Sequence, residues 1–278
     1  MKLSVSNIAW GNEDLEGHLQ LLKRLGCEGV EIAPSCIWDE PVDSTPSQQR
    51  KFRKIVENCG LVVVGLHSLL YTRPDLVVFG SPGTRNRTIE YMRRLIHLCR
   101  ELGGATMVFG SPKNRQRGQM DVEDAFSIAT TFFFKLSEEA KKYDVLLCIE
   151  PLGKNESDFI TSSHEGMELV SRVNHPNFWL HLDAKAMITS KENYAEVFIK
   201  YISDFKHFHV GDPGLAPPGS TGVDHSIIGK ALRDSGYNRF ISIEMCRGFG
   251  PTKEVIKHSV TYVKHCYLNY TELEGGRK

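Results

Sequence analysis

Eight short runs rich in β-branched and aromatic residues recur along the chain, and longer segments with helical periodicity separate them. The runs cover residues 3–10, 29–35, 61–68, 105–111, 145–150, 178–183, 205–210 and 240–245. Strands that alternate with helices predict a parallel sheet covered by helices, because a parallel connection needs a crossover segment. Eight units of roughly thirty residues fit a closed (β/α)8 barrel better than an open, doubly wound sheet.

The segments between the runs support this interpretation. Leu15, Leu19, Leu22 and Leu25 recur at three- and four-residue spacing, as on the apolar face of a helix. The Pro- and Gly-rich stretch 211–224 falls between the seventh strand and the next helix, so we interpret it as a loop and not as a linker. We therefore predict a single-domain TIM barrel over residues 1–270 and a polar, frayed tail over residues 271–278.

Charge and cysteine content exclude several classes of protein. The chain has 34 basic and 34 acidic residues, so no net charge attracts it to nucleic acid or to an anionic membrane. Its seven cysteines are odd in number and lack a C-x-x-C pair, which favours a reducing compartment. The N-terminus has no leader pattern, and no apolar stretch approaches the roughly 18 residues of a membrane span. We expect a cytoplasmic protein without a nucleic-acid or membrane partner.

Polar residues that could carry chemistry end four consecutive predicted strands. They are Glu150, Asp183, His209 and Glu244. In a barrel the carboxyl ends of all strands meet at one mouth, where active sites are built. Three carboxylates at one mouth would repel each other, and a divalent cation relieves this repulsion. An oxygen-rich set with one imidazole suits Mn²⁺ first, then Mg²⁺ or Co²⁺, with Zn²⁺ as a further alternative.

These motifs resemble those of the xylose isomerase-like TIM-barrel superfamily of sugar isomerases and epimerases. The residues that carry the resemblance are IEP at 149–151, HLD at 181–183, HV at 209–210 with Asp212 and PG at 218–219, and IE at 243–244 after SGY. The superfamily includes tagatose and psicose 3-epimerases, hydroxypyruvate isomerase, inosose dehydratase and endonuclease IV. The resemblance extends over nearly the whole chain.

The resemblance implies that the four strand-end residues ligate one divalent cation. It also implies that Glu150 and Glu244 exchange the substrate proton, as the matching glutamates do in the epimerases. A cation bound by a ketone oxygen and a neighbouring hydroxyl would stabilise the enediolate that forms when the adjacent proton leaves. Return of the proton to the opposite face gives an epimer, and its return to the adjacent carbon gives an aldose–ketose isomer. We thus expect a metal-dependent isomerase or epimerase of a small sugar or sugar derivative.

The sequence departs from the ketose 3-epimerases at two substrate contacts. A histidine three residues after the aspartate ligand is Ala186 here, and an arginine six residues after the histidine ligand is Leu215. Lys185 and Arg247 are candidate replacements, and either cation could hold a carboxylate or phosphate of the substrate.

Further candidates for the pocket come from the other predicted units. The candidate substrate contacts are His67, Trp10 and His225, and Glu31 is a candidate for the barrel interior. Lys113, Arg115 and Arg117 form a basic loop after the fourth strand that could help to bind an anion.

Three alternatives to an isomerase remain open at this point. A lyase like inosose dehydratase would use the same proton abstraction and then expel a neighbouring hydroxyl. A DNA-repair enzyme like endonuclease IV would need three zinc ions and about twice as many ligands. A non-catalytic sugar-binding protein could keep the barrel alone. Related barrels are often dimers or tetramers, and the apolar run Phe132, Phe133 and Phe134 is compatible with either a partner surface or core packing.

Overall fold

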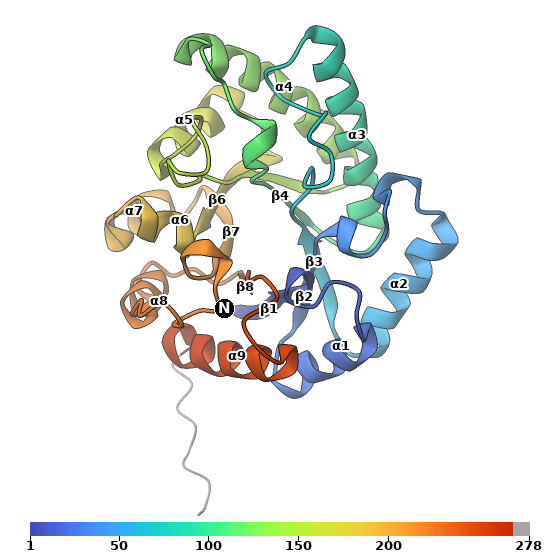
Figure 1. The fold of residues 1–278 in the computed structure, drawn as a ribbon. Coiled ribbons are helices and arrows are strands. Elements are labelled where there is room, and N and C mark those ends of the chain that lie inside the picture. Colours follow the sequence, from blue (N-terminus) through green and yellow to red (C-terminus); the bar gives the residue numbers. More distant parts are fainter. Residues whose placement is uncertain (269–278) are drawn as a thin grey trace, which may run out of the picture.

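The computed structural model describes residues 1–268, and its strands form one closed parallel barrel (Figure 1). The strands are β1 (Lys2–Ser6), β2 (Gly29–Ile32), β3 (Val62–Leu66), β4 (Thr106–Phe109), β5 (Leu146–Ile149), β6 (Phe178–Asp183), β7 (Phe205–Val210) and β8 (Phe240–Ile243). Seven predicted runs contain one strand each, the run 3–10 overlaps β1, and β1 pairs with β8 to close the ring. The predicted (β/α)8 barrel is confirmed.

Helices surround the strands on the outside (Figure 1). They are α1 (Leu15–Arg24), α2 (Pro46–Asn58), α3 (Pro82–Glu101), α4 (Val122–Lys142), α5 (Ser163–Val173), α6 (Ala184–Thr189), α7 (Tyr194–Tyr201), α8 (His225–Asp234) and α9 (Thr252–Leu268). Polar side chains cap the N-termini of several helices: Asp121, for example, accepts a hydrogen bond from Glu123 N and caps α4.

The hydrophobic core lies between the sheet and this ring of helices. Phe133 of α4 stacks on Phe178 of β6 with ring centroids 5.0 Å apart, and its edge faces Phe109 of β4. Phe132 is buried as well, whereas Phe134 is 45% exposed and contacts His175. Two of the three phenylalanines thus pack in the core, and only Phe134 remains for a partner surface.

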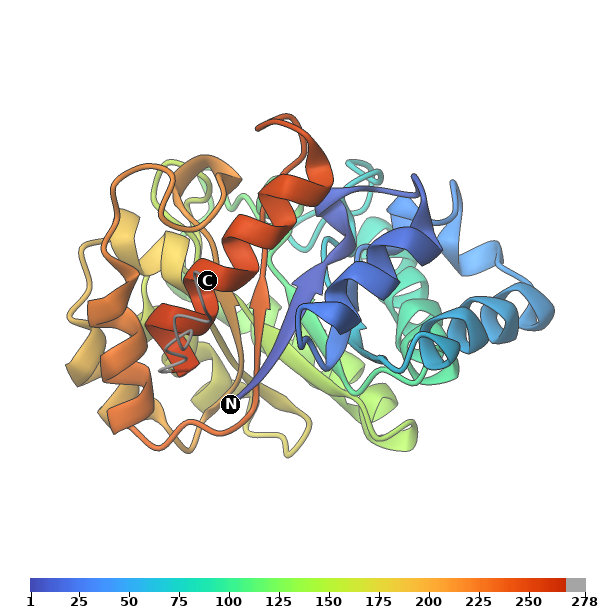
Figure 2. The same ribbon diagram turned by 90° about the horizontal axis from the view of Figure 1, so that it is seen from below.

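The parallel register brings the carboxyl ends of the strands to one end of the barrel. Asp183 of β6 lies opposite His209 of β7, and His209 lies opposite Ser242 of β8. In side view the chain starts at the other end, and the segment between β8 and α9 lies at the mouth (Figure 2). The predicted functional end of the barrel is therefore a single surface.

Polar side chains fill the upper interior of the barrel. Glu31 of β2 contacts His207 and His209 of β7, although β2 and β7 are not neighbours in the sheet. A contact between these strands can only cross the barrel interior. All three side chains are at most 2% exposed, so their hydrogen bonding is decided by protein groups and not by bulk water.

Several predictions concern features beyond the barrel. The predicted tail 271–278 and the last two residues of the predicted domain, 269–270, lie outside the described residues. All seven cysteines are free thiols. Within residues 1–268, no helix combines the length and the apolar character that crossing a bilayer requires.

Candidate metal centre

Four side chains from the ends of β5, β6, β7 and β8 converge at the mouth. Glu150, Asp183, His209 and Glu244 each offer one ligand atom, and these atoms all lie within 4.8 Å of one another. Each residue is at most 9% exposed. The structure thus brings together all four residues predicted as ligands, at a separation that one cation can span.

Asp183 is oriented by the first turn of the helix that follows it. Its Oδ1 accepts a hydrogen bond of 2.8 Å from Lys185 N and caps α6. Its Oδ2 is buried and makes no hydrogen bond among residues 1–268. A buried carboxylate oxygen without a donor is costly unless a cation binds it.

Glu150 occupies space that a glycine leaves free. A Cβ atom built on Gly110, which follows β4, would collide with Glu150 Oε2. Burial, and then the charge of Glu244, raise the pKa of Glu150 well above its usual value. A buried carboxyl group with this pKa shift beside other carboxylates is typical of a cation site or of acid–base chemistry.

Glu244 has the opposite electrostatic environment. Burial alone would raise its pKa, but the charge of His209 and contacts with His209 and His67 outweigh burial and hold the pKa well below the usual range. His209 Nδ1 lies 3.4 Å from Glu244 Oε2. Burial disfavours the charged form of His209, yet Glu31 and Glu244 raise the pKa of its imidazole well above the ordinary value. Without a cation, His209 therefore neutralises part of the negative charge.

Lys185 supplies the second buried positive charge. Its Nζ lies 3.3 Å from Glu156 Oε1 and 3.6 Å from Asp183 Oδ2. Burial opposes the charged ammonium, but Asp183, Glu244, Glu150 and Glu156 raise its pKa above the usual value. Sequence reasoning had missed Glu156, which follows β5 in a loop and is half-buried. The ammonium stays charged beside the proposed ligands, where it can also donate a hydrogen bond to a bound molecule.

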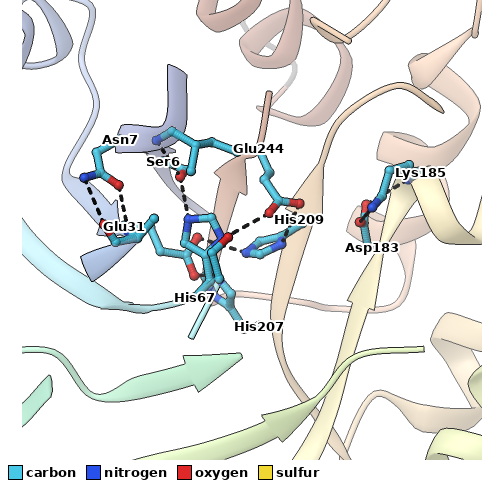
Figure 3. Close-up of polar contacts among 12 residues, drawn as sticks. Ser6, Asn7, Glu31, His67, Asp183, Lys185, His207, His209 and Glu244 are labelled. Carbon is cyan, nitrogen blue, oxygen red and sulfur yellow. Dashed lines mark hydrogen bonds and ion pairs between the residues drawn. The ribbon is translucent and has the colours of Figure 1, made fainter. Parts of the chain in front are cut away.

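Two sets of hydrogen bonds hold the ligands from inside the barrel (Figure 3). Glu31 Oε2 accepts from His209 Nε2 at 2.9 Å, which leaves His209 Nδ1 facing the other ligands. On the other side, His67 lies between Ser6 and Glu244. Hydrogen-bonded carboxylates of this kind orient the histidine ligands of metal sites and select their tautomer.

The sequence analysis assigns no role to two further histidines in the interior, His181 and His207. Each stands two residues before a proposed ligand, Asp183 or His209, so the two-residue period of a strand places it on the same face. That alternation was the signal available in the sequence. Burial lowers the pKa of His181 well below the ordinary value, and both of its ring nitrogens lack hydrogen-bond partners within the described residues.

Trp10, His225 and Arg247, three candidate substrate contacts, pack against residues outside the ligand set. The indole of Trp10 is buried and stacks on His18 of α1, with ring centroids 5.2 Å apart. His225 is buried between Asp212 Oδ1 and the hydroxyl of Tyr267, at 2.7 Å from each.

Arg247 is exposed, and its guanidinium lies against Gly11, in the loop after β1. Of these three residues, Arg247 is thus the one that solvent reaches. The structure brings only His67 and Lys185 of the five candidates into contact with proposed ligands.

Two of the three basic residues in the loop after β4, Arg115 and Arg117, form hydrogen bonds that hold the loop in place. Arg115 is buried and donates to the carbonyl oxygens of Phe109 and Ile160, and burial lowers its pKa to about 10. Arg117 donates to the carbonyl oxygen of Asp158, and its own N–H donates to the Asp158 carboxylate. The loop therefore packs on the β5–α5 loop at the mouth, and Arg115 and Arg117 are tied into that packing.

The residues present fit a divalent cation. The oxygen-rich donor set, the buried Asp183 oxygen without a donor and the room above Gly110 all agree with such an ion. Two other groups could also hold an ion, Glu31 with His207 and His209, and Glu150 with His181 and His209. Both groups share His209 with the main set, so the three sets overlap in space and are not separate centres.

Comparison with known proteins supports the fold and identifies the family. Residues 19–266 match the family described as Xylose isomerase-like TIM barrel. A D-psicose 3-epimerase of Enterocloster bolteae is 23% identical over 248 residues, which is 85% of this chain and 79% of that protein. A probable ketose 3-epimerase of a Synechocystis strain is 23% identical over 257 residues, covering 88% of this chain and 84% of that protein.

Solved structures share the fold over almost the full length. An L-ribulose 3-epimerase superposes with a TM-score of 0.84 at 18% identity, covering 97% of this chain and 95% of the other. A D-psicose 3-epimerase determined in the presence of D-fructose gives 0.82 at 16% identity, with coverage of 96% and 99%. A 3-keto-D-glucoside 4-epimerase from E. coli gives 0.80 at 16% identity, with coverage of 96% and 100%.

Proposed function

Because this chain belongs to the xylose isomerase-like TIM barrel family, we propose that it is a divalent-metal-dependent isomerase or epimerase of a small sugar or sugar derivative. One observation carries the proposal: four ligand groups from four consecutive strands lie within 4.8 Å of one another at the mouth. Three carboxylates and one imidazole favour Mn²⁺, with Mg²⁺, Co²⁺ and Zn²⁺ as alternatives. The curated relatives are named as 3-epimerases of ketoses, which supports the same class of reaction.

The two glutamates divide the proton transfer between them in this proposal. A bound divalent cation would polarise the substrate carbonyl and neutralise the charge that builds on its oxygen. Glu150 and Glu244 would remove the proton next to the carbonyl and return one to the carbon skeleton. In the metal-free chain their pKa values are shifted in opposite directions, so the two carboxyl groups lie in unequal environments before a cation binds.

The substrate contacts differ from those that the family resemblance implies. Ala186 and Leu215 have aliphatic side chains, so neither can donate a hydrogen bond from its side chain to a sugar. Lys185 Nζ is close enough to the ligand set to donate to a substrate oxygen, and the exposed Arg247 can meet an anionic group at the rim. We therefore include sugar acids and sugar phosphates among the candidate substrates, beside neutral ketoses.

The proposal is tested by isotope exchange. The protein, stripped of metal and then loaded with Mn²⁺, is incubated in D₂O with neutral ketoses, sugar acids with a keto group, and ketose phosphates. NMR should show deuterium at the carbon next to the carbonyl in at least one substrate. Glu150→Gln and Glu244→Gln should abolish the exchange, whereas Glu57→Gln on the exposed face of α2 should not change it.

The same experiment separates the alternatives. Irreversible loss of water would indicate a lyase of the inosose dehydratase type, because isomers would instead reach an equilibrium. Retained ligand binding with no exchange in any substrate would indicate a binding protein. A metal content near three ions per chain would favour an endonuclease IV-like enzyme, whereas the overlapping ligand sets predict a content near one.

A further inference from the structure

His67 is a candidate substrate contact that binds a proposed ligand, and protein groups lie at both of its ring nitrogens. It follows β3 and is 1% exposed. Its Nε2 lies 2.5 Å from Ser6 Oγ, and its Nδ1 lies 3.0 Å from Glu244 Oε1. Ser6 ends β1 and Glu244 follows β8, so the imidazole links three different strands beneath the mouth (Figure 3). A ring bound at both nitrogens has no hydrogen bond left for a substrate.

The donors and acceptors along this chain of contacts have one consistent assignment. A carboxylate that binds a cation can only accept, so the Nδ1 of His67 must carry the proton and donate to Glu244. With the proton on Nδ1, the Nε2 of His67 is an acceptor, so the Ser6 hydroxyl donates to it while Ser6 Oγ accepts from Ile8 N at 3.2 Å. Ser68 Oγ is 3.4 Å from the same Nδ1 and adds a longer contact.

We propose that Ser6 and His67 act together as positioning residues for Glu244. Ser6 selects the His67 tautomer with the proton on Nδ1, and His67 then binds Glu244 Oε1, which turns Oε2 toward the metal site. This inference rests on the proposed function, because Glu244 is there both a ligand and a proton carrier. In this inference His67 orients Glu244, whereas the sequence analysis predicts that His67 contacts the substrate directly.

The geometry explains why the orientation of Glu244 needs this support. Oε2 lies 3.4 Å from His209 Nδ1, on the side of the other ligands, whereas Oε1 faces His67. A partial rotation of the carboxylate would move Oε2 away from the other ligands and would stretch the hydrogen bond between Oε1 and His67. Carboxylate ligands in metal sites are themselves commonly held by hydrogen bonds from a second layer of residues.

Two substitutions of His67 separate the role of each ring nitrogen. In His67→Asn the side-chain amide nitrogen takes the place of Nδ1, so it can still donate to Glu244. In His67→Gln the amide reaches the place of Nε2, so the contact with Ser6 is retained and the donor to Glu244 is lost. His97→Asn and His97→Gln, on the exposed face of α3, are the matched controls.

Co²⁺ is the probe, because its visible absorption reports the ligand geometry without any substrate. We expect His67→Asn to bind Co²⁺ with an affinity within about threefold of the wild type and with the same spectrum. His67→Gln should bind about 10- to 100-fold more weakly, as is typical when a group that holds a ligand is lost. It should also show a changed spectrum.

Equal affinity and equal spectra for both His67 variants would overturn the proposal, even if their melting temperatures fall. If the wild type itself binds no divalent ion, the proposed function fails and this inference fails with it.

Ser6→Ala provides a second test in case the His67 variants do not fold. It should change the ¹⁵N resonances of His67 in histidine-labelled protein and shift the Co²⁺ spectrum in the same direction as His67→Gln. Unchanged resonances and an unchanged spectrum would contradict the proposed tautomer control.

Discussion

The two halves of the barrel carry different parts of the site. In the second half, β5 to β8, the strand ends carry the proposed ligands. In the first half, β1 to β4, they carry the groups that orient or accommodate those ligands. The orienting groups are Ser6, Glu31 and His67, and the accommodating residue is Gly110.

In this division, one half of the barrel determines which ion is preferred and the other half determines how the ligand atoms are oriented. The donor types of the second half decide which cation fits, because carboxylate and imidazole preferences differ between metals. The first half decides where each donor points, because its contacts cross the barrel to β7 and to the residue after β8. Substitutions in the second half should therefore abolish binding, whereas those in the first half should weaken it.

The largest effect is expected from Asp183→Asn. The amide oxygen can still cap α6, but the charge that would face the cation is lost. We expect the Mn²⁺ affinity to fall by more than about 100-fold, beyond the range for residues that only support a ligand. Isothermal titration measures this affinity.

Asp121→Asn, at the N-terminus of α4, is the matched control, because it also exchanges a capping aspartate. Its Mn²⁺ affinity should equal that of the wild type. An Asp183→Asn protein that binds Mn²⁺ normally would remove Asp183 from the ligand set.

A smaller effect is expected from Glu31→Gln in the first half. The carboxylate of Glu31 contacts both His207 and His209, and an amide can accept from only one of them and would present N–H groups to the other. The Mn²⁺ affinity should fall by about 10- to 100-fold while binding remains measurable.

If Glu31→Gln lost Mn²⁺ binding as completely as Asp183→Asn, the proposed distinction between the two halves of the barrel would be wrong. Glu28→Gln, one residue before β2 and exposed, is the control for the loss of one charge.

Gly110→Ala should weaken Mn²⁺ binding moderately, through a steric effect alone. The added methyl group would collide with Glu150 Oε2 and displace this ligand without removing it. Overpacking of this kind typically costs about 1–3 kcal/mol of stability. We expect a weaker Mn²⁺ affinity and a lower melting temperature, measured by titration and by calorimetry.

Gly83→Ala, in the first turn of α3, is the matched control, since an added Cβ meets only atoms at 3.9 Å or more. It should leave the Mn²⁺ affinity unchanged and should not lower the melting temperature, because alanine is more favourable than glycine in a helix. Normal Mn²⁺ binding by Gly110→Ala would show that Glu150 does not need this space.

The same two halves explain which parts of the site could be predicted from the sequence. Ligands such as Asp183 and Glu244 were identified because each stands at the end of an apolar run, which is a local signal. The partner of His209 could not be identified, because Glu31 is 178 residues away and on a strand that is not a neighbour. Such a contact exists only once the barrel is closed.

Two predicted substrate contacts show a different limit of the sequence analysis. Trp10 stands four residues beyond β1, and His225 begins α8, so neither belongs to a strand whose alternation would fix its direction. Trp10 instead stacks on His18, and His225 binds Asp212. Proximity to a strand end therefore predicts a residue's height in the barrel but not the direction of its side chain.

The smallest effect concerns the second half in the absence of metal. Burial, and then Glu244, raise the pKa of Glu150 well above its usual value, so the folded metal-free protein retains a proton that the unfolded chain releases. Stability should then fall as the pH rises from about 4.5, near the unfolded pKa. Glu150→Gln removes this dependence, so in EDTA the variant should match the wild type at pH 4 and melt at a higher temperature at pH 8.

Each unit of pKa shift corresponds to about 1.4 kcal/mol, and each kcal/mol to about 2 °C for a chain of this size. With Mn²⁺ the wild type should gain stability relative to the variant, because at a concentration of 100 times the dissociation constant a bound ion adds about 2.7 kcal/mol to the wild type alone. Thermal unfolding between pH 4 and 8, with and without Mn²⁺, measures both effects. If the difference in melting temperature between the two proteins did not change with pH, the pKa of Glu150 would not be raised in the folded protein. The distinction between the two halves of the barrel would then rest on the orientation of the ligands alone.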